Sequence, residues 1–319
     1  MTLSVVASII TGAHVHAATT PAPTTGQALE IGPPVVSLTA DPGQKLTANL
    51  SLRDISSTSL LVTNEVNDFT ANGEDGTPKV LFNTADANPY SLRSWISAIP
   101  SITLKSKDVK SIPVVITVPA SASPGGYYGI IRFTGNPPNL NGTGVSLNAS
   151  LGALVFIRVN GAAKEGVSIA EFTVNNGGSP STFFESTPLS FLVRLKNTGN
   201  IYEQPTGLVT IKDMFGHVTA TLPINADQHI ILPQSTRKFN AALDSSVLGN
   251  RILFGKYSAH LDVTYGISST KISQDFTFWV IPWKLITFAI LAIIAVIIGL
   301  YFIIRRYNKI IVNRANRRK

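Results

Sequence analysis

Polar and apolar residues alternate over many short stretches of the chain, which is the pattern of half-buried β-strands. In the segment 45–52 every second residue is apolar: Leu46, Ala48, Leu50 and Leu52. Because successive side chains of a strand point to opposite faces, this alternation buries one face of a sheet. Further strands are predicted within 60–69, 101–104, 112–118, 127–133, 145–159, 192–196, 207–212, 261–265 and 275–280. Loops rich in Gly, Pro, Asn and Ser separate them, so we expect an all-β chain of antiparallel sandwiches.

The two halves of this β region echo each other. Tyr127 follows Leu104 by 23 residues, and Tyr257 follows Leu232 by 25 residues. Each tyrosine belongs to a short Gly/Tyr element that opens an alternating strand. A tyrosine at the start of a late strand is typical of Ig-like sandwiches, where it forms a tyrosine corner. The sequence therefore predicts two Ig-like antiparallel β-sandwich domains, over residues 27–160 and 161–282.

Residues 285–304 break the alternation, because they are 20 consecutive residues without a charge. A helix of that length spans about 30 Å, the thickness of the hydrocarbon core of a bilayer. Aromatic residues lie near both ends, as they do at membrane–water interfaces: Trp279, Trp283, Tyr301 and Tyr307. The sequence predicts one transmembrane helix over residues 283–304, and the alternative is a buried core helix.

The formal net charge of +8 lies almost entirely behind that segment. Residues 305–319 contain seven of the 26 Lys and Arg residues, so the first 304 residues carry a net charge of only +1. The positive-inside rule then places the tail 305–319 in the cytoplasm and the sandwiches outside a cell membrane. The lipid bilayer explains the basic tail, so no nucleic-acid partner is expected. The expected membrane-interface residues are Trp279, Trp283, Lys284, Tyr301, Arg305, Arg306 and Tyr307.

The first 29 residues carry no charge, and residues 3–10 are mostly apolar. Val15 and Ala17 are small residues at positions −3 and −1 of a cleavage site, which is typical of a signal peptide over 1–17. A basic n-region is missing, which favours a start upstream of Met1. The alternative is a first strand of the mature fold. Residues 18–26 form a Thr/Pro/Ala run that we expect to be a flexible lead-in.

Little in the composition points to catalysis. The chain has no cysteine, which excludes disulfides, thiolate metal sites and a cysteine nucleophile. His217, His229 and His260 have no Gly-x-Ser-x-Gly element beside them, so we expect loop or strand-face residues. Segment 68–79 resembles a calcium loop but has Lys79 where a bidentate Glu is needed. No enzymatic activity, cofactor or metal site is expected.

The turn that contains Glu74 and Asp75 leaves two alternatives open. Its carboxylates and glycines could bind calcium weakly, as loops of sandwiches sometimes do. The other interpretation is a solvated hairpin turn between two strands.

Several motifs in the first half resemble one family. They are the segments 41–44 (DPGQ), 54–57 (DISS), 94–96 (SWI) and 118–133 (VPASASPGGYYGIIRF). Together they resemble the first extracellular domain of the WxL-interacting proteins of the bacterial cell surface, best over residues 35–160. The second half is similar in architecture more than in motif, and the alternative for it is a generic Ig-like stalk. The resemblance implies a peptidoglycan-binding first domain, a second domain that binds a surface protein, and one membrane helix.

We therefore expect a membrane-anchored extracellular protein that binds peptidoglycan, a surface partner protein, or both. Trp95, Tyr127 and Tyr128 are candidates for an aromatic platform that stacks on sugar rings, and the alternative is that they anchor the core. A second hypothesis is an assembly chaperone or accessory subunit that holds a client strand at a sheet edge. An unpaired apolar edge would favour that hypothesis, whereas a charged or proline-blocked edge would count against it.

Overall fold

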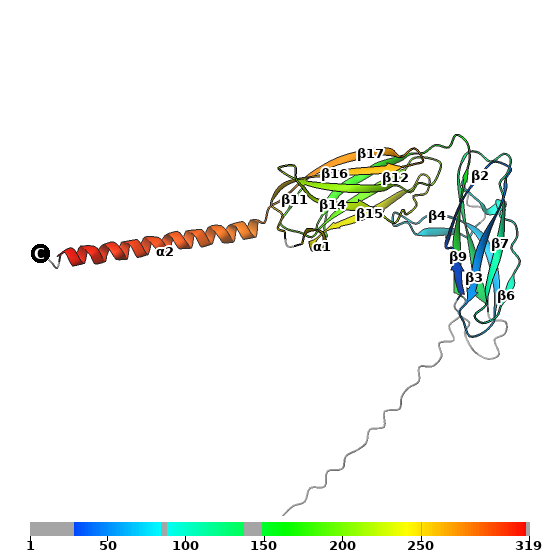
Figure 1. Cartoon of the computed structure of the whole chain (residues 1–319), viewed down its shortest axis with the longest axis horizontal. Helices are drawn as coiled ribbons and strands as arrows, with labels where there is room; N and C mark the ends of the chain where they lie inside the picture. The colour runs from blue at the N-terminus through cyan, green and yellow to red at the C-terminus, as the bar shows by residue number, and fades with distance from the viewer. Residues whose placement is uncertain (1–28, 84–87, 137–148, 250, 317–319) are drawn as a thin grey trace, which may run out of the picture.

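The computed structural model describes residues 29–83, 88–136, 149–249 and 251–316. Two β-sandwiches meet at an angle, and a single long helix leaves the far end of the second one (Figure 1). The all-β class, with two sandwiches and one C-terminal helix, is confirmed. The predicted signal peptide 1–17 and lead-in 18–26 lie outside the described residues.

The first sandwich consists of two sheets. One has the order β1-β3-β7, with β1 (Leu29–Gly32), β3 (Lys45–Asp54) and β7 (Val109–Thr117). The other has the order β2-β9-β8-β4-β5, and β6 (Ile102–Leu104) also pairs with β4. Its strands are β2 (Val35–Ala40), β9 (Ala149–Val159), β8 (Gly125–Asn136), β4 (Leu60–Ala71) and β5 (Pro78–Leu81). The inward face of β3, with Leu50 and Leu52, is fully buried against side chains such as Phe133.

The chain crosses from one sheet to the other between β1 and β2. β1 pairs antiparallel with β3, and β2 then pairs parallel with β9 in the opposite sheet. Pro33 and Pro34 lie between them. Because proline has no N–H to donate, the ladder breaks here and the chain can cross from one sheet to the other.

The second sandwich repeats this arrangement. One sheet has the order β10-β12-β15, with β10 (Val167–Asn175), β12 (Leu189–Asn197) and β15 (Thr236–Leu243). The other has the order β11-β17-β16-β13-β14. Its strands are β11 (Phe183–Phe184), β17 (Thr270–Val280), β16 (Gly255–Tyr265), β13 (Thr206–Asp213) and β14 (Val218–Ile224). In each sandwich a short strand therefore pairs in parallel with the last strand.

The two echoing tyrosines occupy equivalent places near the starts of β8 and β16. The Tyr127 hydroxyl donates to the Ser123 carbonyl over 3.1 Å. The Tyr257 hydroxyl accepts the Phe254 N–H, also over 3.1 Å. A hydroxyl that bonds the backbone a few residues upstream is the geometry of a tyrosine corner, as the sequence suggested.

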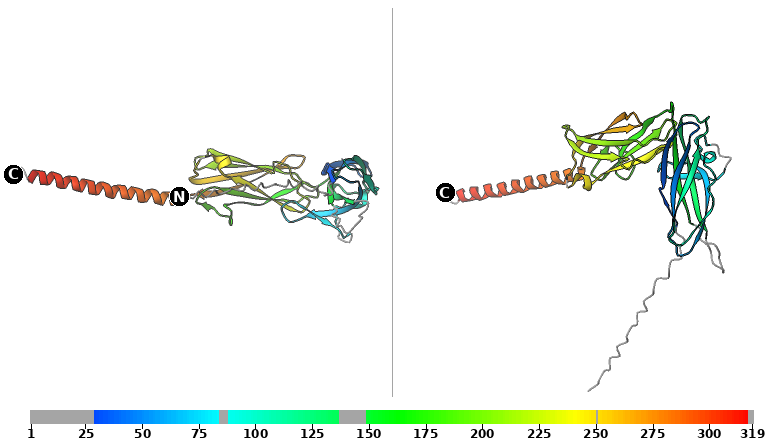
Figure 2. Two further views of the ribbon diagram at one scale, coloured as in Figure 1. Left: turned by 90° about the horizontal axis from the view of Figure 1, so that it is seen from below. Right: turned by 45° about the vertical axis from the view of Figure 1, so that its right-hand side comes forward.

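The described residues also contain three helical segments: η1 (Arg93–Trp95), α1 (Ser245–Leu248) and α2 (Trp283–Asn316). The part of α2 over Trp283–Asn308 has a hydropathy of 2.9 and no burial against the sandwiches, so α2 is long and apolar enough to cross a membrane. Figure 2 shows α2 projecting away from the second sandwich in two further views.

Candidate binding site at the joint of the two sandwiches

The two sandwiches are connected by residues 160–166, and one asparagine organises this joint. Asn200 accepts the Gly126 N–H on its carbonyl over 2.9 Å, and its amide donates to the Pro124 carbonyl over 3.0 Å. Its side-chain oxygen also accepts the Lys164 N–H over 2.8 Å. A Cβ at Gly126 would lie 3.0 Å from the Cα of Ile201, so the close approach of the two backbones requires glycine there.

The hairpin of β4 and β5 makes a second connection across the joint. In its turn, the Glu74 carbonyl accepts the Lys238 N–H over 2.9 Å, and the Glu74 carboxylate lies 2.8 Å from the Arg194 guanidinium. Arg194 also pairs with Glu171 at 2.6 Å. This turn closes the β4–β5 hairpin, and its Glu74 carboxylate is paired with the Arg194 guanidinium. Weak calcium binding by the turn stays a prediction.

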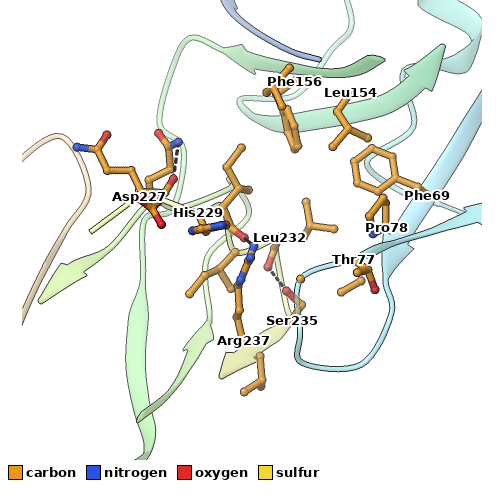
Figure 3. A pocket seen from close by; sticks show the side chains of 18 of the residues that line it. Phe69, Thr77, Pro78, Leu154, Phe156, Asp227, His229, Leu232, Ser235 and Arg237 are labelled. Atoms are coloured by element: carbon orange, nitrogen blue, oxygen red, sulfur yellow. Dashed lines mark hydrogen bonds between the residues drawn. The ribbon is translucent and has the colours of Figure 1, made fainter. Parts of the chain in front are cut away.

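Between these two connections lies an apolar cavity of about 390 Å³, which we call the joint cavity. Phe69, Leu154 and Phe156 line it from the first sandwich, and Ile230 and Leu232 line it from the second (Figure 3). Some of these side chains also form a third apolar cluster, separate from the two sandwich cores. The ring centroids of Phe69 and Phe156 are 5.9 Å apart, in an edge-to-face arrangement.

Polar groups surround the apolar floor of the joint cavity. The Arg237 guanidinium donates to the Ile230 carbonyl over 2.9 Å, and burial lowers the pKa of Arg237 from its usual value. Asp227, His229 and Arg237 lie across the cavity from Phe69 and Phe156 in Figure 3. The site therefore combines an apolar floor with a hydrogen-bonding margin, which is the usual composition of a ligand-recognition site.

A second, more polar pocket of about 350 Å³ lies at the same joint; we call it the Glu203 pocket. Glu203 is only 3% exposed, and its carboxylate accepts the Gly266 N–H over 3.2 Å. Burial, reinforced by the nearby Glu165 carboxylate, raises the pKa of Glu203 to about 7. Glu165 itself pairs with Arg158 at 3.0 Å, so the single cation of the pocket wall is already neutralised.

The three aromatic residues proposed as a sugar platform do not share one face of the sheet. Trp95 and Tyr127 contact each other in a tilted arrangement, with ring centroids 4.3 Å apart, against the core of the first sandwich, and Trp95 is buried. Tyr128 points to the opposite face, where it is buried beside Phe69 in the joint cluster. Burial raises the pKa of Tyr128. In this structure they pack as core anchors, and their role in ligand binding stays a prediction.

The expected membrane-interface residues all lie on or next to α2. Trp283, Tyr301 and Tyr307 are exposed, as are Arg305 and Arg306. Trp279 lies next to the last residue of β17 and stacks on Phe183, with ring centroids 6.4 Å apart, and Lys284 pairs with Glu185 at 2.9 Å.

The three histidines lie on surfaces. His217 follows the β13–β14 turn and pairs with Asp213, and His229 lines the joint cavity. His260 is on β16, where a hydrogen bond to Asp275 raises its pKa. Among the described residues no group of three or more His, Asp or Glu side chains is placed to hold a metal ion.

Sequence reasoning missed Phe69, Phe156 and Leu232 as joint residues. One signal was available: residues 154–157 read Leu-Val-Phe-Ile, without the alternation of a half-buried strand. A strand that is apolar on both faces is covered on both faces. In the structure the second sandwich provides this extra cover through Leu232.

Three of the exposed strand edges, those of β7, β14 and β17, carry features that discourage strand addition. The outer edge of β17 forms backbone hydrogen bonds at its C-terminal end, and among the described residues only β11 and its neighbours supply the partners. The remainder of that edge carries Lys271 and Asp275, and the edge strands β7 and β14 contain Pro113 and Pro223. Charges and prolines are the usual protection of edges against added strands. By this criterion the structure counts against client binding at the edges of β7, β14 and β17.

No family model matches this sequence, and no curated protein does. Among solved structures, the chain is similar to the class 5 fimbriae chaperone CfaA, with a TM-score of 0.40, 13% identity, and coverage of 80% of this chain and 100% of that one. It is also similar to the E. coli chaperone DraB, with a TM-score of 0.36, 14% identity, and coverage of 79% and 97%. For the Pseudomonas aeruginosa chaperone CupB2 the TM-score is 0.35, with 11% identity and coverage of 76% and 96%. At these TM-scores the likeness carries no argument about function.

Proposed function

We propose that this protein is a non-enzymatic, membrane-anchored accessory protein that holds a polypeptide partner at the joint of its two sandwiches. In this proposal α2 crosses the membrane, the basic tail 305–319 is cytoplasmic, and both sandwiches are outside. The joint cavity carries the proposal. Its apolar floor can accept an apolar side chain, and its polar margin can bond the backbone of the same segment.

The walls of the joint cavity favour a peptide over a free sugar or nucleotide. The floor is made of the apolar side chains Phe69, Leu154, Phe156 and Leu232, which offer no hydrogen-bonding group. A sugar would need several convergent hydrogen bonds there, whereas a leucine or phenylalanine side chain needs only the apolar contact. The margin residues Gln228 and His229 belong to a loop fixed by Asn225, whose side chain bonds three backbone groups. The margin is therefore preorganised.

The resemblance to WxL-interacting proteins gives a different prediction, namely that the first sandwich binds peptidoglycan. It stays a prediction, and the same preparation can test it. Binding to peptidoglycan should then depend on residues 35–160 and not on the joint cavity.

Photocrosslinking in the full chain, made in cells and kept in its membrane, tests the proposal. A photoreactive residue at Gln228 should capture a discrete polypeptide, whereas one at Ser273, on the open edge of β17, should not. Ile230→Glu, which places a charge on the apolar wall, should reduce capture several-fold. Leu208→Glu is the matched control, since Leu208 is exposed on β13 and does not line the cavity.

Three results would overturn the proposal. Capture at residue 228 that Ile230→Glu leaves unchanged would mean that the cavity is not the site. Capture at residue 273 alone would favour strand addition. The third result has two parts: no polypeptide is captured at residue 228, and the protein sediments with purified peptidoglycan whether or not Ile230→Glu is present. This result would favour the prediction that the first sandwich binds peptidoglycan.

A further inference from the structure

Large apolar side chains that face solvent gather at one end of the second sandwich, the end from which α2 leaves. Among the described residues between 160 and 283, eleven large apolar side chains are exposed, and nine lie at this end. We call these nine residues the apolar rim: Phe183, Met214, Phe215, Val218, Val247, Ile252, Phe254, Trp279 and Trp283. The other two, Leu208 and Ile267, lie toward the joint.

Strand register brings the separate segments of the apolar rim together. Asp213 pairs with Tyr257, so the turn after β13, which carries Met214 and Phe215, lies beside the start of β16. A Cβ at Gly255 would collide with the Met214 methyl group, which confirms their contact. β11 pairs with the end of β17, which places Phe183 against Trp279.

The exposure of Ile252 and Phe254 follows from the local structure. Leu253 between them is buried, and the Phe254 N–H is fixed by the tyrosine corner of Tyr257. Alternation then directs Ile252 and Phe254 outward, where they are 73% and 59% exposed. Phe215 is 77% exposed at the tip of its turn. Three large side chains are therefore held in solvent by a rigid sandwich.

The start of α2 is fastened to this same end. Only Ile281 and Pro282 separate β17 from α2, a distance of roughly 10 Å at most. The Ile281 N–H donates to the Phe184 carbonyl over 2.8 Å, and Lys284 pairs with Glu185. Figures 1 and 2 show α2 running away from the end that carries the apolar rim. A bilayer that contains α2 therefore faces the rim directly.

The chemistry of the apolar rim suits the lipid interface. Phenylalanine, tryptophan and isoleucine partition into the headgroup region, and an apolar patch of this kind on a soluble surface marks a binding site. Arg251 and Lys256 are exposed beside Ile252 and Phe254, where they can contact anionic headgroups. The continuity with α2 selects a lipid surface over a second copy of the chain, because the bilayer already adjoins this end.

We propose that the apolar rim rests in the headgroup region of the bilayer, with Phe215, Ile252 and Phe254 inserted beside Trp283. The second sandwich then has a fixed orientation on the membrane and does not reorient about a flexible linker. This inference rests on the proposed membrane anchoring by α2.

Site-specific labelling is direct, because the chain has no cysteine. Phe215→Cys and Phe254→Cys are made in the full chain, labelled with an environment-sensitive fluorophore, and reconstituted in vesicles of phosphatidylcholine and phosphatidylglycerol. Some of the lipids carry a nitroxide quencher at the headgroup or along the acyl chain. Leu208→Cys is the control on the same sandwich, and Ile294→Cys reports on α2 itself.

The labels at residues 215 and 254 should be quenched several-fold more strongly by the headgroup nitroxide than the label at residue 208. The label at residue 294 should be quenched by the acyl-chain nitroxide. Quenching at 294 with none at 215 and 254 would overturn the docking and leave the anchoring intact. Absence of quenching at 294 would overturn both. Energy transfer between labels at residue 215 on different chains, without lipid quenching, would overturn the docking and indicate a contact between copies.

Discussion

The buried carboxyl group of Glu203 should make the stability of the second sandwich depend on pH. Its pKa is raised from 4.5 to about 7, chiefly by burial and then by the Glu165 carboxylate, while the Gly266 N–H and Arg158 oppose the shift. A carboxyl whose pKa is higher in the folded state binds its proton more tightly there. Its contribution to stability is therefore complete below pH 4.5 and is lost as the pH rises through about 7.

The size of this effect follows from the shift of the pKa. Each pKa unit corresponds to about 1.4 kcal/mol, so the shift of Glu203 gives a loss of at most roughly 3 kcal/mol between pH 4.5 and 7.5. Glu203→Gln keeps the shape of the side chain and removes its titration. The variant should lose this part of the pH dependence and be more stable than the wild type above pH 7.

Urea unfolding of the full chain in detergent micelles at a series of pH values measures the difference. The free energy of unfolding of the wild type minus that of Glu203→Gln should fall steadily between pH 4.5 and 7.5. Other titrating groups, including His260 with its raised pKa, cancel in this difference. Glu30→Gln is the matched control, since Glu30 is an exposed carboxylate that pairs with Arg53 on the first sandwich. A flat difference curve, or one that rises with pH, would refute the argument.

Three further variants test the packing. Phe278→Ala should destabilise the second sandwich by about 3–5 kcal/mol, because the ring is fully buried, and urea unfolding measures the loss. Gly126→Val should push Ile201 away and speed exchange of the residue 126 amide in hydrogen-exchange experiments; unchanged protection would contradict the close approach. Tyr127→Phe removes the hydroxyl bond to Ser123 and should cost about 1 kcal/mol in the first sandwich, again by urea unfolding.

Alternation predicted strands such as β3 and β12, in which more buried and more exposed residues alternate. β3 was predicted at 45–52 and extends over Lys45–Asp54, and β12 was predicted at 192–196 and extends over Leu189–Asn197. β9 was predicted from residue 145, and its described part begins at Ala149. The strands that were missed include short or peripheral ones, such as β5 and β11, which have too few residues for a period to show.

The joint cavity could not be predicted from alternation, for a physical reason. Phe69, Phe156 and Leu232 point away from the two sandwich cores, on faces that a single sandwich would leave in solvent. Local periodicity reports that a face is apolar but not which distant segment covers it. In the sequence, Leu232 can be recognised only as part of a repeat. The long apolar helix α2, by contrast, needs no tertiary partner to be predicted, because length and hydropathy alone identify a helix that could cross a membrane.

The joint cavity and the apolar rim lie at opposite ends of one rigid element. β17 has 11 residues from Thr270, near the joint, to Val280, beside α2, and it therefore spans roughly 35 Å. If the rim rests on the lipid, the second sandwich sets the height of the joint cavity above the bilayer at about that distance. The contacts of Glu74 and Asn200 hold the first sandwich against the second sandwich. A partner that inserts an apolar residue into the cavity must then present it at that height, so a partner anchored in the headgroup layer needs a linker of about 10 extended residues to reach it.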